Sequence, residues 1–166
     1  MHKLLILCVD DEREVLDSVM QDLSDFESHF IIEAAESVAE AKDVIADYQQ
    51  QQIPLALILC DHIMPKETGI HFLIELNQQE EQTRKTRKVL LTGQAGLDDT
   101  IEAINHSSLD FFINKPWQAE QLYQVVREQL TQYVIEHEQD LMPWIQVLNA
   151  ETILNAIAAN RMSYGE

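Results

Sequence analysis

The chain has 166 residues, 46% of them hydrophobic, which is enough apolar material for one good core and a small appendage. Acidic residues outnumber basic ones 29 to 11, and the formal net charge is −18 at pH 7. A surface of that sign repels phosphate backbones and anionic lipid, which argues against nucleic-acid binding by this segment and against a membrane partner.

Cysteine usage and the N-terminus indicate the compartment. Cys8 and Cys60 both sit inside apolar runs, where a free thiol behaves as a small hydrophobe, and the pattern is not that of a disulfide framework. The apolar run at the start of the chain is too short for a signal-peptide core or a bilayer span. We therefore expect a reduced, cytoplasmic protein.

Short apolar runs alternate with segments of helical period along most of the chain, which is typical of strand-helix units and a parallel sheet. The runs that predict strands are 4–10, 30–35, 55–61, 88–93 and 110–116. A helix is predicted after each strand, because apolar residues recur there at helical spacing. These helices begin near Val15, Val38, Gly69, Leu97 and Gln118. The sequence thus predicts a doubly wound α/β fold with five parallel strands and five flanking helices. The first and third runs are nearly unbroken and predict central strands, and the second and fifth predict edges.

The apolar spacing of the fifth predicted helix continues to about Glu136. Pro143 then interrupts the pattern, and apolar residues recur at helical spacing over roughly 142–161. We divide the chain into a domain at 1–130 and a helical extension at 131–166. A lone helix is marginal in water, so the extension is expected to dock on the domain, to pair with another chain, or to serve as a linker.

Polar residues that can carry chemistry stand at the ends of four predicted strands. Asp10 and Asp11 end the first run, Asp61 the third, Thr92 the fourth and Lys115 the fifth. In an open parallel sheet the ligand site lies beyond the carboxyl ends of the strands. Each residue alone has an ordinary structural explanation, but their joint placement predicts one site.

Three carboxylates held together repel one another, and a hard divalent cation relieves that repulsion. Mg²⁺, with Mn²⁺ as a substitute, accepts one or two carboxylates together with phosphate oxygens. An ionised Asp61 can then act as an oxygen nucleophile towards a phosphoryl group. Lys115 and Thr92 are the expected stabilisers of the phosphoryl oxygens.

The motifs "CVDDE", "ILCDHIMPKETG", "VLLTGQA" and "FFINKPW" resemble the receiver domain of two-component response regulators over roughly residues 1–130. The resemblance implies a flavodoxin-like sheet of order 2-1-3-4-5. It also implies that Asp61 accepts a phosphoryl group from a histidine kinase or a histidine phosphotransfer protein. By the same resemblance Asp11 and Asp61 bind Mg²⁺ directly, Asp10 acts through water, and the backbone carbonyl of Ile63 completes the ligands.

The resemblance further implies a switch in which Thr92 moves towards the phosphate and Phe112 turns inward. Both changes would alter the face formed by the fourth helix, the fifth strand and the fifth helix. A cis peptide before Pro116 is a similar family feature. The output would be a fused or separate partner, because an output enzyme domain is missing from this chain and its only reactions would be self-phosphorylation and autodephosphorylation. A homodimer through the fifth helix and the extension is a further expectation.

Two other functions stay open: a Mg²⁺-dependent phosphotransfer or phosphatase enzyme, and a pseudo-receiver that only docks proteins. The five pocket residues are all present, which argues against the second. Position 67 is Glu, where the family more often has an apolar residue. The histidines show no ligand spacing with one another or with the cysteines, which argues against a zinc site.

Overall fold

The computed structural model describes residues 3–79, 81–93 and 109–163, and its centre is a five-stranded parallel sheet. The strand order is β2-β1-β3-β4-β5, as the family resemblance implies. The strands are β1 (Leu4–Val9), β2 (Phe30–Ala35), β3 (Leu55–Asp61), β4 (Arg87–Thr92) and β5 (Phe111–Asn114). Every residue of β1 and β3 is buried, which confirms that the two unbroken apolar runs are central strands.

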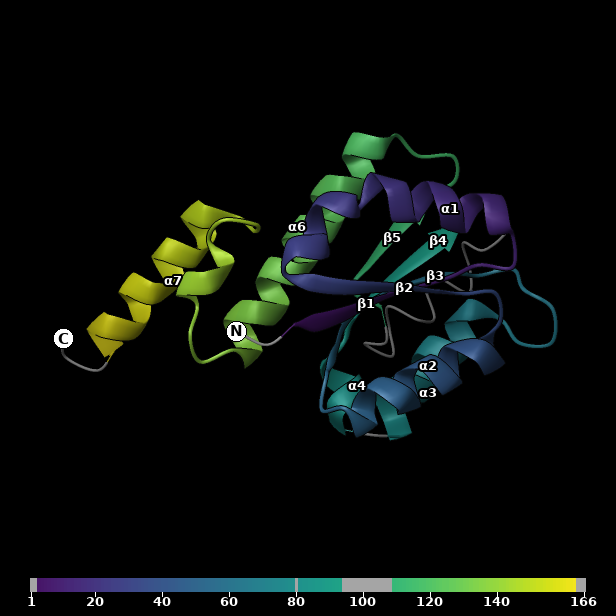
Figure 1. Ribbon diagram of the computed structural model, residues 1–166, viewed down its shortest axis with the longest axis horizontal. Helices are drawn as coiled ribbons and strands as arrows, with labels where there is room; N and C mark the ends of the chain where they lie inside the picture. The colour runs from purple at the N-terminus through teal and green to yellow at the C-terminus, as the bar shows by residue number, and fades with distance from the viewer. Residues whose placement is uncertain (1–2, 80, 94–108, 164–166) are drawn as a thin grey trace.

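Helices cover both faces of this sheet (Figure 1). One face carries α1 (Arg13–Asp22) and α6 (Ala119–His137), whose buried residues form one apolar cluster with the sheet. The other face carries α2 (Val38–Gln50), α3 (Gly69–Gln79) and the short α4 (Glu81–Lys85). A 3₁₀ turn, η1 (Ser24–Ser28), joins α1 to β2. The doubly wound architecture is therefore confirmed.

Some elements differ from their predicted bounds by one or two residues, and other differences are larger. The fifth strand ends at Asn114, earlier than predicted, because Pro116 lacks the N–H that a strand would need to continue. The short α4 was not predicted. The helix predicted from Leu97 lies outside the described residues.

The extension is two short elements rather than one helix over 142–161. A 3₁₀ turn, η3 (Met142–Trp144), is followed by α7 (Ala150–Ser163). Asn149 defines the start of α7, because its side-chain oxygen accepts a hydrogen bond from the Thr152 N–H at 3.2 Å. The Asn149 N–H in turn donates to the Thr131 hydroxyl on α6 at 3.2 Å. The first turn of α7 is thereby fixed to α6.

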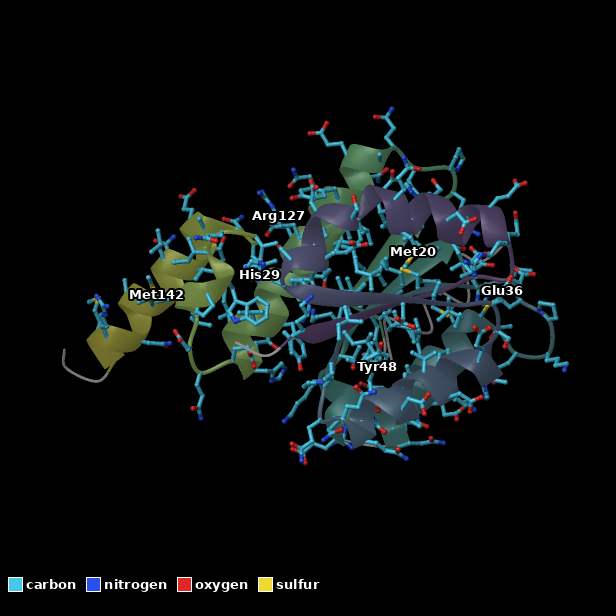
Figure 2. All side chains as sticks on the ribbon, viewed as in Figure 1. Met20, His29, Glu36, Tyr48, Arg127 and Met142 are labelled. Carbon is cyan, nitrogen blue, oxygen red and sulfur yellow. The ribbon has the colours of Figure 1, made fainter. Side chains whose placement is uncertain are left out.

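Trp144 anchors the extension to the domain. Its ring is 1% exposed and lies 5.3 Å from the ring of Phe30, at the start of β2. Leu141, Leu148 and Ile153 belong to the same buried cluster as β1 and α6. Figure 1 shows α7 continuing away from the sheet beyond this junction, and Figure 2 labels Met142 on the extension. Position 130, the proposed domain boundary, lies inside α6.

Among residues 3–79, 81–93 and 109–163, no helix is both long enough and apolar enough to cross a membrane.

Candidate functional site

Three carboxylates meet at the carboxyl edge of the sheet, where β1 and β3 lie side by side. Asp10 follows the last residue of β1, and Asp61 is the last residue of β3. One carboxylate oxygen from each of Asp10, Asp11 and Asp61 lies within 4.8 Å of the others. Asp10 and Asp61 are buried and Asp11 is exposed. The structure thus brings together the three acids that the sequence places at strand ends.

Lys115 reaches this cluster from the turn after β5. Its Nζ lies 2.9 Å from Asp10 Oδ2 and 3.0 Å from Asp61 Oδ1. The backbone N–H of Lys115 donates to the Thr92 carbonyl at 2.8 Å, which holds the start of the turn against β4. The Lys115–Pro116 peptide is cis, as the family resemblance implies. One ammonium therefore bridges two buried carboxylates.

Burial and charge oppose each other at Asp61. Burial raises the pKa of its carboxyl above the ordinary value, the hydrogen bond from Lys115 opposes this rise, and the negative charge of Asp10 adds to it. Burial also disfavours the charged form of Lys115, but its hydrogen bonds to both acids and their negative charges together outweigh burial and raise the Lys115 pKa. The ionised form of Asp61 is therefore disfavoured in the folded protein, whereas the positively charged form of Lys115 is favoured.

The raised pKa of Asp61 predicts a pH-dependent effect of Asp61→Asn on stability without metal. A carboxyl whose pKa is higher in the folded than in the unfolded state costs stability when it is ionised. We expect Asp61→Asn to increase the free energy of unfolding at neutral pH. The gain should shrink as the pH falls through the folded-state pKa, since the parent side chain then becomes neutral.

Urea unfolding in EDTA at a series of pH values measures this difference. Asp43→Asn is the matched control, because Asp43 is exposed on α2 and its replacement should be neutral. A gain that stays constant from neutral to acid pH would contradict the electrostatic explanation.

The remaining predicted residues lie at the end of β4, on β5 and in the loop after β3. Thr92 is buried at the end of β4, and its hydroxyl donates to the Gly93 carbonyl at 2.9 Å. Phe112 on β5 is 37% exposed, with its ring 6.5 Å from that of Phe111. Ile63, in the loop between β3 and α3, has a side chain exposed to 61%. In this state the Phe112 side chain is on the surface.

Two backbone features of the site were not predicted. The N–H of Glu12 donates to Asp10 Oδ1 at 2.9 Å and fixes the orientation of that carboxylate. Gly69 donates to the His62 carbonyl at 2.9 Å, and a Cβ at this position would lie 2.0 Å from the Asp61 carbonyl oxygen. From the sequence alone, Gly69 predicts only the start of the third helix. Close backbone approach is the stronger reason for glycine there.

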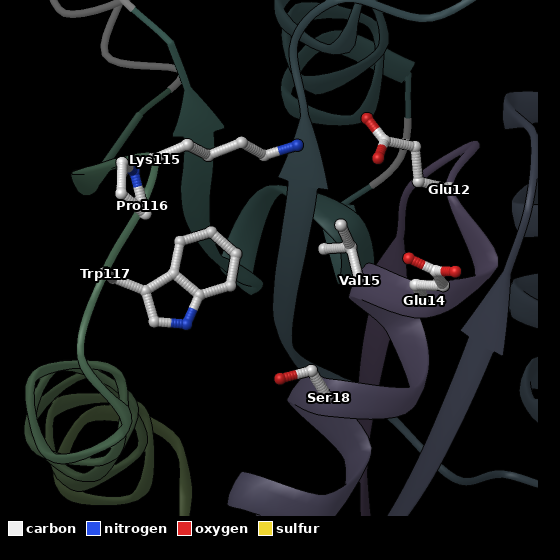
Figure 3. A pocket seen from close by; sticks show the side chains of 7 residues that line it. All are labelled: Glu12, Glu14, Val15, Ser18, Lys115, Pro116 and Trp117. Carbon is white, nitrogen blue, oxygen red and sulfur yellow. The ribbon is translucent and has the colours of Figure 1, made fainter.

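A cavity of about 490 Å³ lies next to Lys115, between α1 and the turn that leads into α6. Figure 3 shows Glu12, Glu14, Val15 and Ser18 on one side of it and Lys115, Pro116 and Trp117 on the other. The walls combine an indole, an aliphatic side chain and two acids. The cavity provides an open, partly apolar approach beside the acidic cluster.

The donor set of the cluster fits a hard divalent cation. It consists of carboxylate oxygens only, which is the ligand type that Mg²⁺ prefers. Asp10, Asp11 and Asp61 would hold such an ion. Lys115 pairs with Asp10 and Asp61 but carries only one positive charge, whereas the three ionised acids carry three negative charges. A divalent cation would compensate the remaining two.

Comparison with known proteins agrees with this geometry. The family model of the response regulator receiver domain matches residues 6–127. The hydrogenase transcriptional regulatory protein HoxA of Bradyrhizobium diazoefficiens is 32% identical over 138 residues, which cover 80% of this chain and 25% of that protein. HoxA of Cupriavidus necator is 28% identical over 123 residues, or 74% of this chain and 23% of that protein. The chain spans about a quarter of the length of these relatives.

Solved structures give the same result. The receiver domain protein (CheY-like) of Methanospirillum hungatei superposes with a TM-score of 0.68 at 25% identity, covering 81% of this chain and 99% of that one. The signal receiver domain of an HD domain-containing protein of Pseudomonas fluorescens gives a TM-score of 0.71 at 24% identity, covering 84% and 96%. Receiver domains are signalling domains rather than enzymes in themselves. This chain belongs to the response regulator receiver domain family.

Proposed function

We propose that the chain is a phosphorylation-controlled signalling module in which Asp61 accepts a phosphoryl group from a histidine kinase or a histidine phosphotransfer protein. The observation that carries this proposal is the bridge from Lys115 to both Asp10 and Asp61, beside a third acid at the same sheet edge. An ammonium held there can contact a phosphoryl oxygen as soon as one arrives. Family membership supports the same role.

The chemical step is a transfer between a donor histidine and Asp61. An Asp61 oxygen forms a bond to phosphorus, the phosphorus–nitrogen bond of the donor breaks, and the leaving imidazole keeps the electron pair and takes up a proton. Asp10, Asp11 and Asp61 offer oxygens within 4.8 Å of one another and would hold Mg²⁺, with the Ile63 backbone carbonyl as the further ligand that the family resemblance implies. An ion held there would supply positive charge beside the phosphoryl oxygens.

The switch would use Thr92 and Phe112. The Thr92 hydroxyl is bonded to a neighbouring carbonyl in this state, so it can exchange that bond for one to a phosphoryl oxygen. Phe112 is partly exposed and has a position on β5 from which it can turn inward when Thr92 moves. The phosphate would bias these positions by stabilising one of two arrangements. The responding face would include β5 and α6.

The relatives also suggest what kind of protein this chain controls. The matched segments make up 23% and 25% of the relatives, which are transcriptional regulatory proteins. We propose that phosphorylation controls a fused or separate output partner of the same general kind. Because the net charge of −18 repels phosphate backbones, any contact with nucleic acid would be made by that partner. The cytoplasm, where histidine kinases present their phosphoryl groups, is the proposed location.

Metal removal tests the proposed reaction. Incubation with acetyl phosphate and Mg²⁺ should add one phosphoryl group per chain, and EDTA in place of Mg²⁺ should reduce labelling to background. Lys115→Gln should slow labelling on the order of a hundredfold, because it removes a charged contact to the transferring group. Intact-protein mass spectrometry over time measures both.

Lys66→Gln is the matched control, since Lys66 is an exposed lysine in the loop after Asp61. It should be labelled at the parent rate. Labelling that continues unchanged in EDTA, or in Lys115→Gln, would contradict the assigned roles.

A further inference from the structure

A second group of metal-ligating side chains lies on α3, apart from Asp10, Asp11 and Asp61. It consists of Glu67, in the loop before α3, and of His71 and Glu75 on the helix itself. His71 and Glu75 are four residues apart on α3 and therefore share one face of the helix, and Glu67 joins them from the preceding loop. One ligand atom from each lies within 4.8 Å of the others, and His71 Nδ1 is 2.6 Å from Glu67 Oε1. One nitrogen and two oxygen ligands therefore converge.

The three side chains border an open hollow of about 580 Å³, which Lys42, Lys66 and Thr68 complete. The side chain of His71 is 70% exposed, whereas those of Glu67 and Glu75 are about one-fifth exposed at 22% and 20%. The carboxylates are thus partly desolvated and the imidazole is within reach of solvent. An ion entering from solution can reach all three without moving the backbone.

The site already attracts a cation from within the chain. Lys42 Nζ lies 2.9 Å from Glu75 Oε1, and the same ammonium is 6.0 Å from the centre of the Phe72 ring. The hydrogen bond from Lys42 holds the pKa of Glu75 below its ordinary value. Lys42 comes from α2 and is exposed to 45%, so it can leave for water. It neutralises one acid with one charge, where a divalent ion would neutralise both.

We propose that Glu67, His71 and Glu75 form a second metal site, selective for a borderline divalent cation such as Zn²⁺ over Mg²⁺. The imidazole nitrogen decides the selectivity, because Zn²⁺ accepts mixed nitrogen and oxygen ligands while Mg²⁺ strongly prefers oxygen. Three protein ligands leave a fourth tetrahedral position open to water. Lys42 is then a competitor for the site rather than one of its ligands.

The present spacing suits such an ion after small side-chain rotations. Two ligand atoms of one tetrahedral zinc lie roughly 3.4 Å apart, given bonds of about 2.1 Å. The contact between His71 and Glu67, at 2.6 Å, has to open slightly, and the widest separation, within 4.8 Å, has to close. Rotation of the Glu and His side chains supplies both changes. Binding would tie the loop that follows Asp61 to the first turns of α3.

Isothermal titration calorimetry with ZnCl₂ tests the proposal on the full chain without an affinity tag. Titrations are run in excess Mg²⁺ and repeated in an Asp11→Asn/Asp61→Asn double variant, so that the first acidic cluster does not contribute. We expect one equivalent of Zn²⁺ to bind in both backgrounds. His71→Ala should weaken binding at least about tenfold, and Lys42→Met should strengthen it by removing the competing ammonium.

His137→Ala is the matched control, because His137 is a helical histidine 3.6 Å from a single carboxylate, that of Glu136. It should bind Zn²⁺ as the parent does. The thermal midpoint should rise with Zn²⁺ in the parent and in His137→Ala but not in His71→Ala. Zn²⁺ binding that His71→Ala leaves unchanged, that disappears in the Asp11→Asn/Asp61→Asn background, or that Lys42→Met weakens would overturn the assignment.

Discussion

Asp61→Asn should abolish the labelling of this chain by acetyl phosphate, while the protein keeps its fold. An amide oxygen is a far weaker nucleophile than a carboxylate, and Asp61 is the buried acid that both Lys115 and the neighbouring acids face. Mass spectrometry of the intact chain should show one added phosphoryl group in the parent and none in the variant. Asp43→Asn, on the exposed side of α2, should be labelled fully.

The same experiment separates the receiver function from its two alternatives. A signalling module takes up one phosphoryl group per chain and then stops. A phosphatase or phosphotransfer enzyme would turn over small phosphate esters many times, and a docking scaffold would take up none. Equal labelling of Asp61→Asn and the parent would show that another residue accepts the phosphoryl group, and it would refute the proposed chemistry.

Trp144→Ala should destabilise the whole domain by about 3 to 5 kcal/mol, the usual cost of deleting a large buried aromatic side chain. Trp144 is 1% exposed, packs on Phe30 at the start of β2, and shares one apolar cluster with β1 and α6. We expect a single cooperative urea transition at a lower midpoint. If the extension were a separate linker, the transition of the domain would not change.

Met142 supplies the control from the same 3₁₀ turn. Its side chain is 59% exposed, so Met142→Ala should change the free energy of unfolding by no more than about 0.5 kcal/mol. A chain that ends after residue 137 should be destabilised in the same direction as Trp144→Ala, because both uncover Phe30. Together these variants test the proposed boundary at 130, which falls inside α6.

Much of the fold could be predicted because buried segments consist mainly of apolar residues. Strands covered on both faces need unbroken apolar runs, and β1 and β3 have them, whereas the mixed runs became the edge strands β2 and β5. The proximity of Asp10, Asp11, Asp61 and Lys115 follows from the same logic, since parallel strands deliver their ends to one sheet edge. Lys88 is an exception, because a lysine in a sequence normally predicts an exposed position. It stands in β4 with 2% exposure, and its ammonium donates to the carbonyls of Thr86 and Arg84 at 2.8 and 3.2 Å.

The sequence by itself determined the parallel sheet, its central strands and the acids and lysine at its carboxyl edge, because hydrophobic period is a local property and the alternation of strands with helices favours parallel pairing. Only the tertiary structure decided that Trp144 closes the core beside Phe30, and that Lys42 from α2 meets Glu75 on α3. It also decided that His62 is buried at 2% exposure, although its place in the loop after Asp61 predicts partial exposure. These outcomes depend on which elements pack together, and the period of a single segment carries no information about its neighbours in space.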